Sequence, residues 1–171
     1  MARFVAFLRG VSPMNCKMPE LKRSMETAGF TDVRTILASG NVAFDTSARS
    51  PSTLERKAEA AMKQVLGRSF YTIVRSQAQL VDMLEADPFA KFKVPAKAKR
   101  VVTFLREPPA TKIKLPYRFE GVHILAIEDR EIFTAYEPHP RGPIFMTLLE
   151  KNFGRDVTTR TWDTIKKCSD S

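Results

Sequence analysis

Cationic and polar side chains gather in short loops and turns, where they could bind an anion. The segment RGVSPMNCK (residues 9–17) lies between an apolar run and a helical pattern. The N–H groups at the start of that helix could therefore meet a phosphate. The turn ASGNV (residues 38–42) adds Ser39 and Asn41 as polar groups. Ordinary turn chemistry would also explain both segments, and the sequence leaves this choice open.

A second cationic segment, KFKVPAKAKR (residues 91–100), holds five basic residues and no acidic one. It lies midway along the chain, after a predicted helix and before an apolar run. Such a segment can be a solvated linker, or it can follow the phosphates of a polyanion. Its candidate contacts for nucleic acid are Lys91, Lys93, Lys97, Lys99 and Arg100.

The third candidate segment is TTRTWDTIKK (residues 158–167), near the C-terminus. Arg160 could hold a carboxylate or phosphate through two parallel N–H groups. Trp162, the one tryptophan of the chain, could stack against a ligand. The alternative is that Trp162 and Ile165 close the core, with Thr161 as the N-cap of a last helix.

The catalytic and cofactor motifs with a known mechanism are missing from this sequence. It contains no phosphate-binding or dinucleotide-binding glycine loop, no serine-hydrolase elbow, and no zinc-protease or zinc-deaminase pattern. Cys16 and Cys168 lie far apart and match no metal or disulfide spacing. We therefore expect no metal and no cofactor. Ser39 has no recognisable base, so no nucleophilic role is assigned to it.

The charge balance is basic, with 28 Lys and Arg against 19 Asp and Glu and a formal net charge of +9. This excess can reflect a polyanionic partner or simply solubility. No apolar run approaches the roughly 18 residues of a membrane span, and the first apolar stretch is short for a signal peptide. We expect a monomeric, cytoplasmic protein that makes no membrane contact.

The elements that must position these residues follow a recurring order. Residues 1–75 predict strand, helix, strand, strand, helix, strand, which is the ferredoxin-like plan. In this interpretation Gly40 and Asn41 form a two-residue hairpin turn. Ser52 and Glu55 form a capping box for the second helix. The third strand lacks the aromatic pattern of RNA-recognition domains, so its phenylalanine is assigned to the core.

The second half repeats this order loosely. RVVTFLR (residues 100–106) matches RFVAFLR (residues 3–9) at five of seven positions: Arg, Val, Phe, Leu and Arg. The elements expected after it are a weak helix at 110–119, strands at 122–128 and 131–136, a helix at 143–153 and a C-terminal helix. A helix at 77–86, capped by Ser76, and the basic connector separate the halves.

We therefore expect an α+β protein made of two packed ferredoxin-like βαββαβ halves from an internal duplication, with a C-terminal helix. The expected segments are a first half at 1–75, a helix and basic connector at 76–99, and a second half at 100–171.

Four strings of this sequence resemble a known bacterial family. They are FLRGV, MPELKRSMETAGFTDVRTILASGNVAFDT, LLEKNFG and TTRTWDTIKK, and they resemble domain of unknown function 1697. The resemblance implies two packed ferredoxin-like halves and brings no established activity. The sequence departs from the family pattern in two places. Ser12-Pro13-Met14 stands where members have a glycine-rich loop, and Thr161 stands where they have asparagine.

Two functional hypotheses follow. The first is a noncatalytic protein that contacts nucleic acid or a phosphorylated ligand through a basic surface, with Arg9, Lys17 and Arg34 as anion contacts and the connector cations around them. The second is an enzyme or small-molecule binder with a pocket at the seam between the halves. Its lining would be Arg9, Ser39, Asn41, Arg160 and Trp162.

Overall fold

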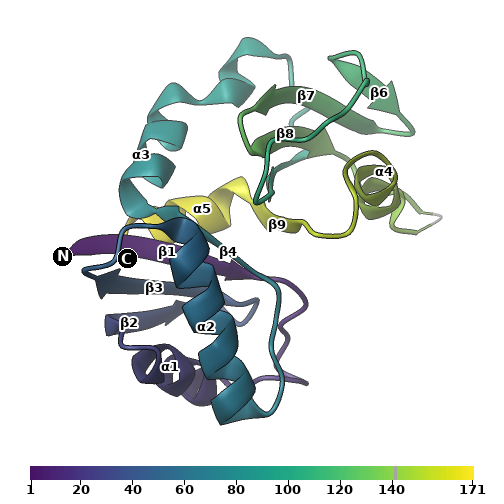
Figure 1. Ribbon diagram of the computed structural model, residues 1–171. Coiled ribbons are helices and arrows are strands. Elements are labelled where there is room, and N and C mark those ends of the chain that lie inside the picture. The colour runs from purple at the N-terminus through teal and green to yellow at the C-terminus, as the bar shows by residue number, and fades with distance from the viewer. Residues whose placement is uncertain (141) are drawn as a thin grey trace. The chain divides into compact units, whose positions relative to one another are not determined.

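The computed structural model describes residues 1–140 and 142–171 of the chain. These residues form a mixed α+β structure with two antiparallel sheets and five α-helices (Figure 1). The chain divides into two compact units. Unit 1 comprises Met1–Glu85 and Ile165–Ser171, and unit 2 comprises Ala86–Thr164. Within the described ranges, every helix is too short or too polar to cross a membrane.

Unit 1 contains a four-stranded sheet with the order β2-β3-β1-β4. The chain passes through its elements in the order β1 (Ala2–Leu8), α1 (Met18–Thr27), β2 (Thr31–Ile36), β3 (Asn41–Thr46), α2 (Pro51–Leu66) and β4 (Thr72–Ser76). Helix α3 (Gln77–Ala86) follows directly. Its predicted cap is confirmed, because Ser76 Oγ accepts the N–H of Gln79 at 3.1 Å.

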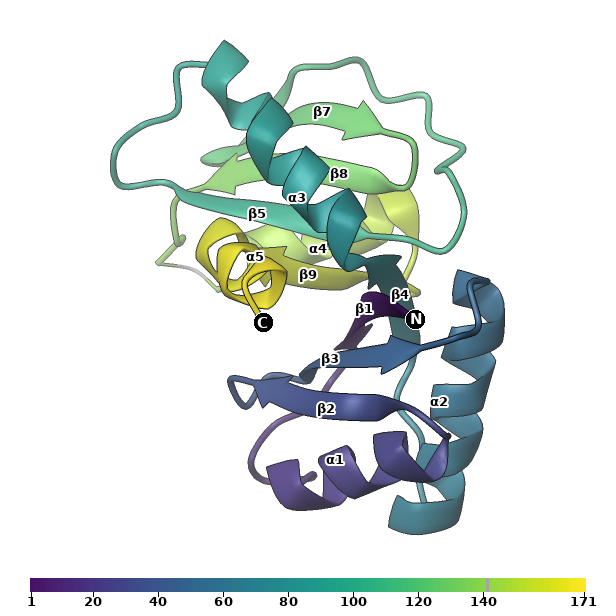
Figure 2. The ribbon, with the colours of Figure 1, turned by 90° about the vertical axis from the view of Figure 1, so that its left-hand side faces the viewer.

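Helices α1 and α2 cover the same face of this sheet (Figure 2). Alternate residues of β1 point to that face, so Phe4 and Leu8 meet Leu21 of α1 and Leu54 of α2 in one core. Phe44 stacks on Phe30 in the same core, with ring centroids 4.0 Å apart. The aromatic residues of unit 1's core are therefore packing residues, as the sequence predicts.

Two carboxylates of α2 bind the edge strand β4. Glu55 accepts the N–H of Val74 at 2.9 Å, and Glu59, one helical turn later, accepts the N–H of Thr72 at 3.1 Å. The predicted capping box is therefore wrong. Ser50 is the N-cap instead and accepts the N–H of Thr53 at 3.4 Å, with Pro51 next to it at the start of the helix.

The β2–β3 turn also differs from its prediction. It spans residues 37–40, and Asn41 is already the first residue of β3, paired with Ile36. Leu37 and Gly40 both have positive φ, at 59° and 87°. A four-residue turn leaves Leu37 half-exposed. The sequence predicts the hairpin correctly, but not its length.

Unit 2 contains a five-stranded sheet with the order β6-β7-β8-β5-β9. Its elements are a 3₁₀ turn η1 (Pro88–Lys91), β5 (Lys99–Phe104), β6 (Tyr117–Phe119), β7 (Val122–Glu128), β8 (Glu131–Tyr136), α4 (Ile144–Phe153) and β9 (Thr158–Thr161). Helix α5 (Trp162–Ser169) begins in unit 2 and ends in unit 1.

The weak helix predicted at 110–119 is wrong, because this segment is extended and ends in β6. From Thr111 to Leu115 the side chains alternate between half-buried and exposed, which is a period of two rather than 3.6. Pro116 supplies no N–H for a helix. The predicted strands at 122–128 and 131–136 and the helix ending at Gly154 are confirmed.

The unit 2 sheet is packed on both faces. On one face, Leu148 and Leu149 of α4 join Val101 and Ile124 in an apolar cluster. On the other face, Trp162 meets Phe89 and Phe133 edge to face, with centroids 5.0 Å and 6.5 Å away. This second cluster holds the start of α5 against the sheet.

Candidate functional site

The loop at 9–17 binds its own backbone. Asn15 accepts the N–H of Ser12 at 2.9 Å and donates to the carbonyl of Gly10 at 2.8 Å. The N–H of Cys16 donates to the carbonyl of Ser12 at 3.1 Å. These amides already have partners inside the loop, which favours a connecting turn over a phosphate cradle.

The start of α1 is also a poor place for an anion. Lys17 is its N-cap and gives no side-chain cap, Pro19 supplies no N–H, and Glu20 puts a carboxylate in the first turn. The neighbouring Cys16 is buried, and that burial together with the charge of Glu20 raises the pKa of its thiol, against a smaller opposing effect of Arg68. Its reactive thiolate is therefore suppressed at neutral pH.

The structure brings the loop and the β2–β3 turn together within unit 1. The carbonyl of Gly40 accepts the N–H of Leu8 at 2.8 Å. A Cβ on Gly40 would lie 2.9 Å from Cβ of Val11. Asn41 is fully buried and donates to the carbonyl of Ile36 at 2.9 Å and to Ser39 Oγ at 3.0 Å. Its amide therefore shapes the turn.

The predicted cations of unit 1 occupy separate positions. Arg9 follows β1 and is half-buried, with its backbone N–H on the carbonyl of Tyr71 at 2.9 Å. Lys17 is exposed before α1. Arg34 lies on β2, exposed, with Nε 3.5 Å from the Asp32 carboxylate. Arg34 thus already has an anionic neighbour.

Arg160 and Trp162 belong to unit 2. Arg160 lies on β9, half-buried, and donates to the carbonyl of Thr159 at 2.8 Å. Trp162 is only 6% exposed and lies within the aromatic cluster with Phe89 and Phe133. Thr161 caps α5 as predicted, accepting the N–H of Thr164 at 3.2 Å. The packing favours the interpretation of Trp162 as a core residue.

The basic connector is the most exposed cationic segment of the candidate set. It runs from η1 through an irregular stretch into the first residues of β5. Every one of its cations is exposed: Lys91, Lys93, Lys97, Lys99 and Arg100. Within the described residues, none of the ion pairs involves these five side chains. Their charges are available to a partner in solution.

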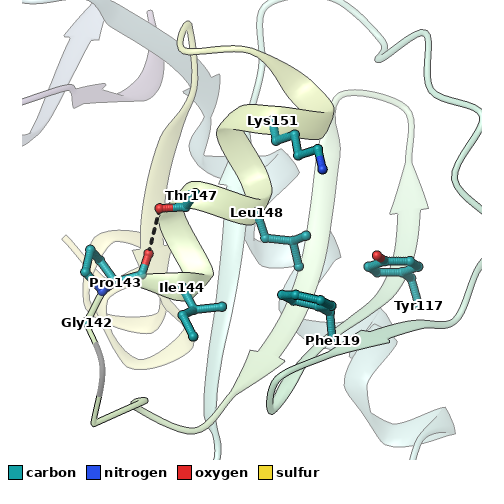
Figure 3. Close-up of a pocket in the computed structure, with 8 residues that line it drawn as sticks. All are labelled: Tyr117, Phe119, Gly142, Pro143, Ile144, Thr147, Leu148 and Lys151. Carbon is teal, nitrogen blue, oxygen red and sulfur yellow. Dashed lines mark hydrogen bonds between the residues drawn. The ribbon is translucent and has the colours of Figure 1, made fainter.

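Unit 2 also contains a pocket of about 400 Å³ that the sequence does not predict (Figure 3). One wall is β6, with Tyr117 and Phe119, and the other is α4 with the residues before it. The α4 side supplies Gly142, Pro143, Ile144, Thr147, Leu148 and Lys151. If residues 110–119 formed the predicted helix, β6 would not exist and this wall would be missing. The sequence signal for β6 is the two-residue alternation that ends in YRF.

A smaller cavity of about 150 Å³ shares Gly142, Pro143 and Ile144 with this pocket. It includes His139, whose Nε2 lies 3.2 Å from the Glu120 carboxylate. Among the residues that the structure describes, no group of three His, Cys, Asp or Glu side chains lies close enough together to hold a metal ion.

Comparisons with known proteins give a family and a fold. A family model described as "Protein of unknown function (DUF1697)" matches residues 1–133. A search of curated proteins found no match. The structure of the conserved bacterial protein SP0830 from Streptococcus pneumoniae is similar, with a TM-score of 0.73 and 19% sequence identity. That match covers 99% of this chain and 97% of the other, and at this identity it supports the fold alone.

Proposed function

The chain belongs to the DUF1697 family, whose function is unknown, and we propose that it binds phosphate groups without catalysis, through the basic connector at 91–100. The ligand is a nucleic acid or a phosphorylated small molecule. In this proposal the protein works as a monomer in the cytoplasm. The observation that carries it is the run of five exposed cations in ten residues without an acid.

Exposed ammonium groups without acidic neighbours suit phosphate binding. Each phosphate that a lysine neutralises releases counterions from a nucleic acid, so the gain is entropic and falls with salt. Lysine acts here as a point charge and gives affinity without sequence preference. The connector therefore favours weak, nonspecific binding to a phosphate backbone.

The predicted contacts of unit 1 fit this role less well. Lys17 is exposed and could add one phosphate contact, whereas Arg34 would first have to leave Asp32. Arg9 is half-buried. We rank Lys17 above these two arginines as a supplementary contact.

We also propose that the two units descend from one duplicated ferredoxin-like plan. Unit 1 has the strand order β2-β3-β1-β4, and the corresponding strands of unit 2 follow the order β7-β8-β5-β9. Each unit has a helix before its last strand, α2 and α4. In unit 2 the place of α1 along the chain is taken by the extended segment and β6, which adds one strand at the edge. This equivalence supports the repeat between residues 3–9 and 100–106.

Fluorescence anisotropy with labelled single-stranded and duplex oligonucleotides tests the proposed activity. We expect dissociation constants on the order of 10⁻⁴ to 10⁻⁶ M at physiological salt, weakening steeply between about 50 mM and about 200 mM salt. Competition with inorganic tripolyphosphate distinguishes the two sources of phosphate. Displacement by tripolyphosphate at equal phosphate concentration favours a small ligand, whereas failure to displace favours a polymer.

A pair of triple variants of equal charge makes the test specific. Replacement of Lys91, Lys93 and Lys97 by Gln should lower the slope of log affinity against log salt by about 2 to 3. The control replaces Lys22, Arg23 and Lys57, exposed on α1 and α2, by Gln and removes the same charge. Equal losses in both variants would show that only net charge matters, and the connector would not be the site.

A further inference from the structure

The pocket between β6 and α4 has a composition that selects for one class of small molecule. Its walls are largely apolar, with Phe119 and Leu148 facing each other across it (Figure 3). Phe119 is 48% exposed, so its ring offers apolar surface to a ligand. A volume of about 400 Å³ lies within the range typical of ligand sites.

The polar groups of this pocket are mostly hydrogen-bond donors. Lys151 extends from α4 toward the side of the pocket where Tyr117 lies. The structure shows no ion pair for the Lys151 ammonium within the described part of the chain. Thr147 donates its hydroxyl proton to the carbonyl of Pro143 at 3.1 Å, so it has no donor left for a ligand. The remaining donors are the Lys151 ammonium and the Tyr117 hydroxyl.

The first turn of α4 adds partial positive charge to the same pocket. Pro143 is its N-cap and gives no side-chain cap, and no acidic residue lies in the first turn. Pro143 and Ile144 both line the pocket. The N–H of Ile144 already donates to the carbonyl of Gly142 at 2.9 Å, so the helix dipole, rather than this amide, favours an anion at the helix start, and Lys151 favours one two turns further along. The apolar part of a ligand that lies between these two positions would cover Phe119 and Leu148.

We propose that this pocket binds a small organic anion that has an apolar ring and a carboxylate, with Lys151 binding the carboxylate. The ring packs between Phe119 and Leu148, and Tyr117 donates a second hydrogen bond. This site lies outside the basic connector and does not depend on the phosphate binding proposed above, since none of the connector cations lines it.

Three ligands with the same ring and different charge test the proposal. Indole-3-acetate is the anion, indole-3-acetamide is neutral and tryptamine is a cation. Each is titrated into the full chain, uniformly labelled with ¹⁵N, and binding is followed by amide shifts in β6 and α4. The expected order of affinity is acetate, then acetamide, then tryptamine, with acetate about fivefold tighter than acetamide, as for a partly exposed ion pair.

Two variants separate the charge from the ring. Lys151→Gln should reduce acetate binding to the level of the acetamide and leave the acetamide unchanged. Phe119→Ala should weaken all three ligands, and because Phe119 is half-exposed its loss leaves the core intact. The control Lys166→Gln, on an exposed position of α5, removes the same charge and should change nothing.

The proposal is overturned if the three ligands bind equally, if none shifts amides of β6 and α4, or if Lys166→Gln matches Lys151→Gln. The triple connector variant provides the link to the proposed function. It should retain indole-3-acetate binding while losing oligonucleotides, so failure of one activity is distinguishable from failure of the other.

Discussion

Two glycines of unit 1 share a left-handed backbone and differ in their surroundings. Gly10 has a φ of 81°, and a Cβ there would meet no atom within 4 Å. Gly40 has a φ of 87°, and its Cβ would lie 2.9 Å from Val11 Cβ. Gly10→Ala should cost about 1 to 2 kcal/mol from backbone conformation alone. Gly40→Ala should cost more, because Val11 and Leu8 must also move.

Urea unfolding of the two variants measures this difference. The excess loss in Gly40→Ala reports the close packing of the β2–β3 turn on the loop at 9–17. Equal losses of stability in the two variants would mean that the β2–β3 turn can move away from Val11 at no cost in free energy. The close packing that places Ser39 near the loop at 9–17 would then be unsupported.

At the residue scale, substitutions of Trp162 and Arg160 should differ in how much stability they remove. Trp162 is buried between Phe89 and Phe133, so Trp162→Ala should lower the free energy of unfolding by about 3 to 5 kcal/mol. Arg160 is half-buried on β9, so Arg160→Ala should lower the free energy of unfolding much less. Denaturant melts of both variants check this order. A Trp162→Ala protein as stable as the parent would remove Trp162 from the core.

The role of a single residue is best predicted from the sequence when its side chain contacts residues close to it in the chain. Ser76 and Thr161 are helix caps because their hydroxyls reach an amide three residues ahead. Asn41 is harder to interpret, because the same amide could bind a ligand or hold a turn. Its burial and its hydrogen bonds to Ile36 and Ser39 show that it holds the turn. The candidate contacts Lys17 and Arg34 stay predictions.

At the scale of elements, α2 and β4 are joined through side chains rather than through apolar contact alone. Glu55 is 4% exposed and accepts the amide of Val74. Glu55→Leu removes this acceptor and should cost about 1 to 3 kcal/mol, as expected for a buried donor that loses its partner. The Val74 amide should then exchange faster with deuterium than in the parent.

Glu55→Gln is the matched control, because it keeps a carbonyl oxygen of the same reach. It should retain most of the protection of Val74. If both variants exchange alike, the charge of Glu55 matters rather than its oxygen at Val74. If neither variant changes exchange, β4 is held by its pairing with β1 alone.

Elements with a clear local pattern are predictable, and those fixed by distant contacts are not. Strands β7 and β8 match their predicted bounds, because short, largely apolar runs lie on both sides of a polar turn at Asp129 and Arg130. Glu55 is misassigned as part of a capping box because its partner Val74 lies nineteen residues away. The pocket escapes prediction for the same reason, since β6 and α4 are separated by residues 120–143.

At the scale of the whole molecule, the chain returns to unit 1 at its end. Residues Ile165–Ser171 belong to that unit, where Ile165 and Cys168 are fully buried. Gln77 donates to the carbonyls of Ser169 and Ser171 at 2.9 Å and 2.7 Å. A chain ending at Thr164 should therefore lose at least the roughly 2 to 5 kcal/mol of a truncated Ile side chain.

Hydrogen exchange resolved by residue checks this prediction. Amides of β1 and β4 should lose protection in the shortened chain, whereas amides of β7 and β8 should keep theirs. Lys166→Ala, an exposed position of the same helix, is the control and should leave both sets protected. Protection lost equally in both units would contradict an effect confined to unit 1.

The carboxylates of α2 also affect how copies of the protein meet one another. Strand β4 ends its sheet, and a bare sheet edge offers a row of amides to any extended segment that arrives. Here the outward amides of Thr72 and Val74 are already taken by Glu59 and Glu55. A strand from another copy would have to displace two anionic acceptors before it could pair. Helix α2 thus covers part of this sheet edge, and pairing between copies along β4 is disfavoured.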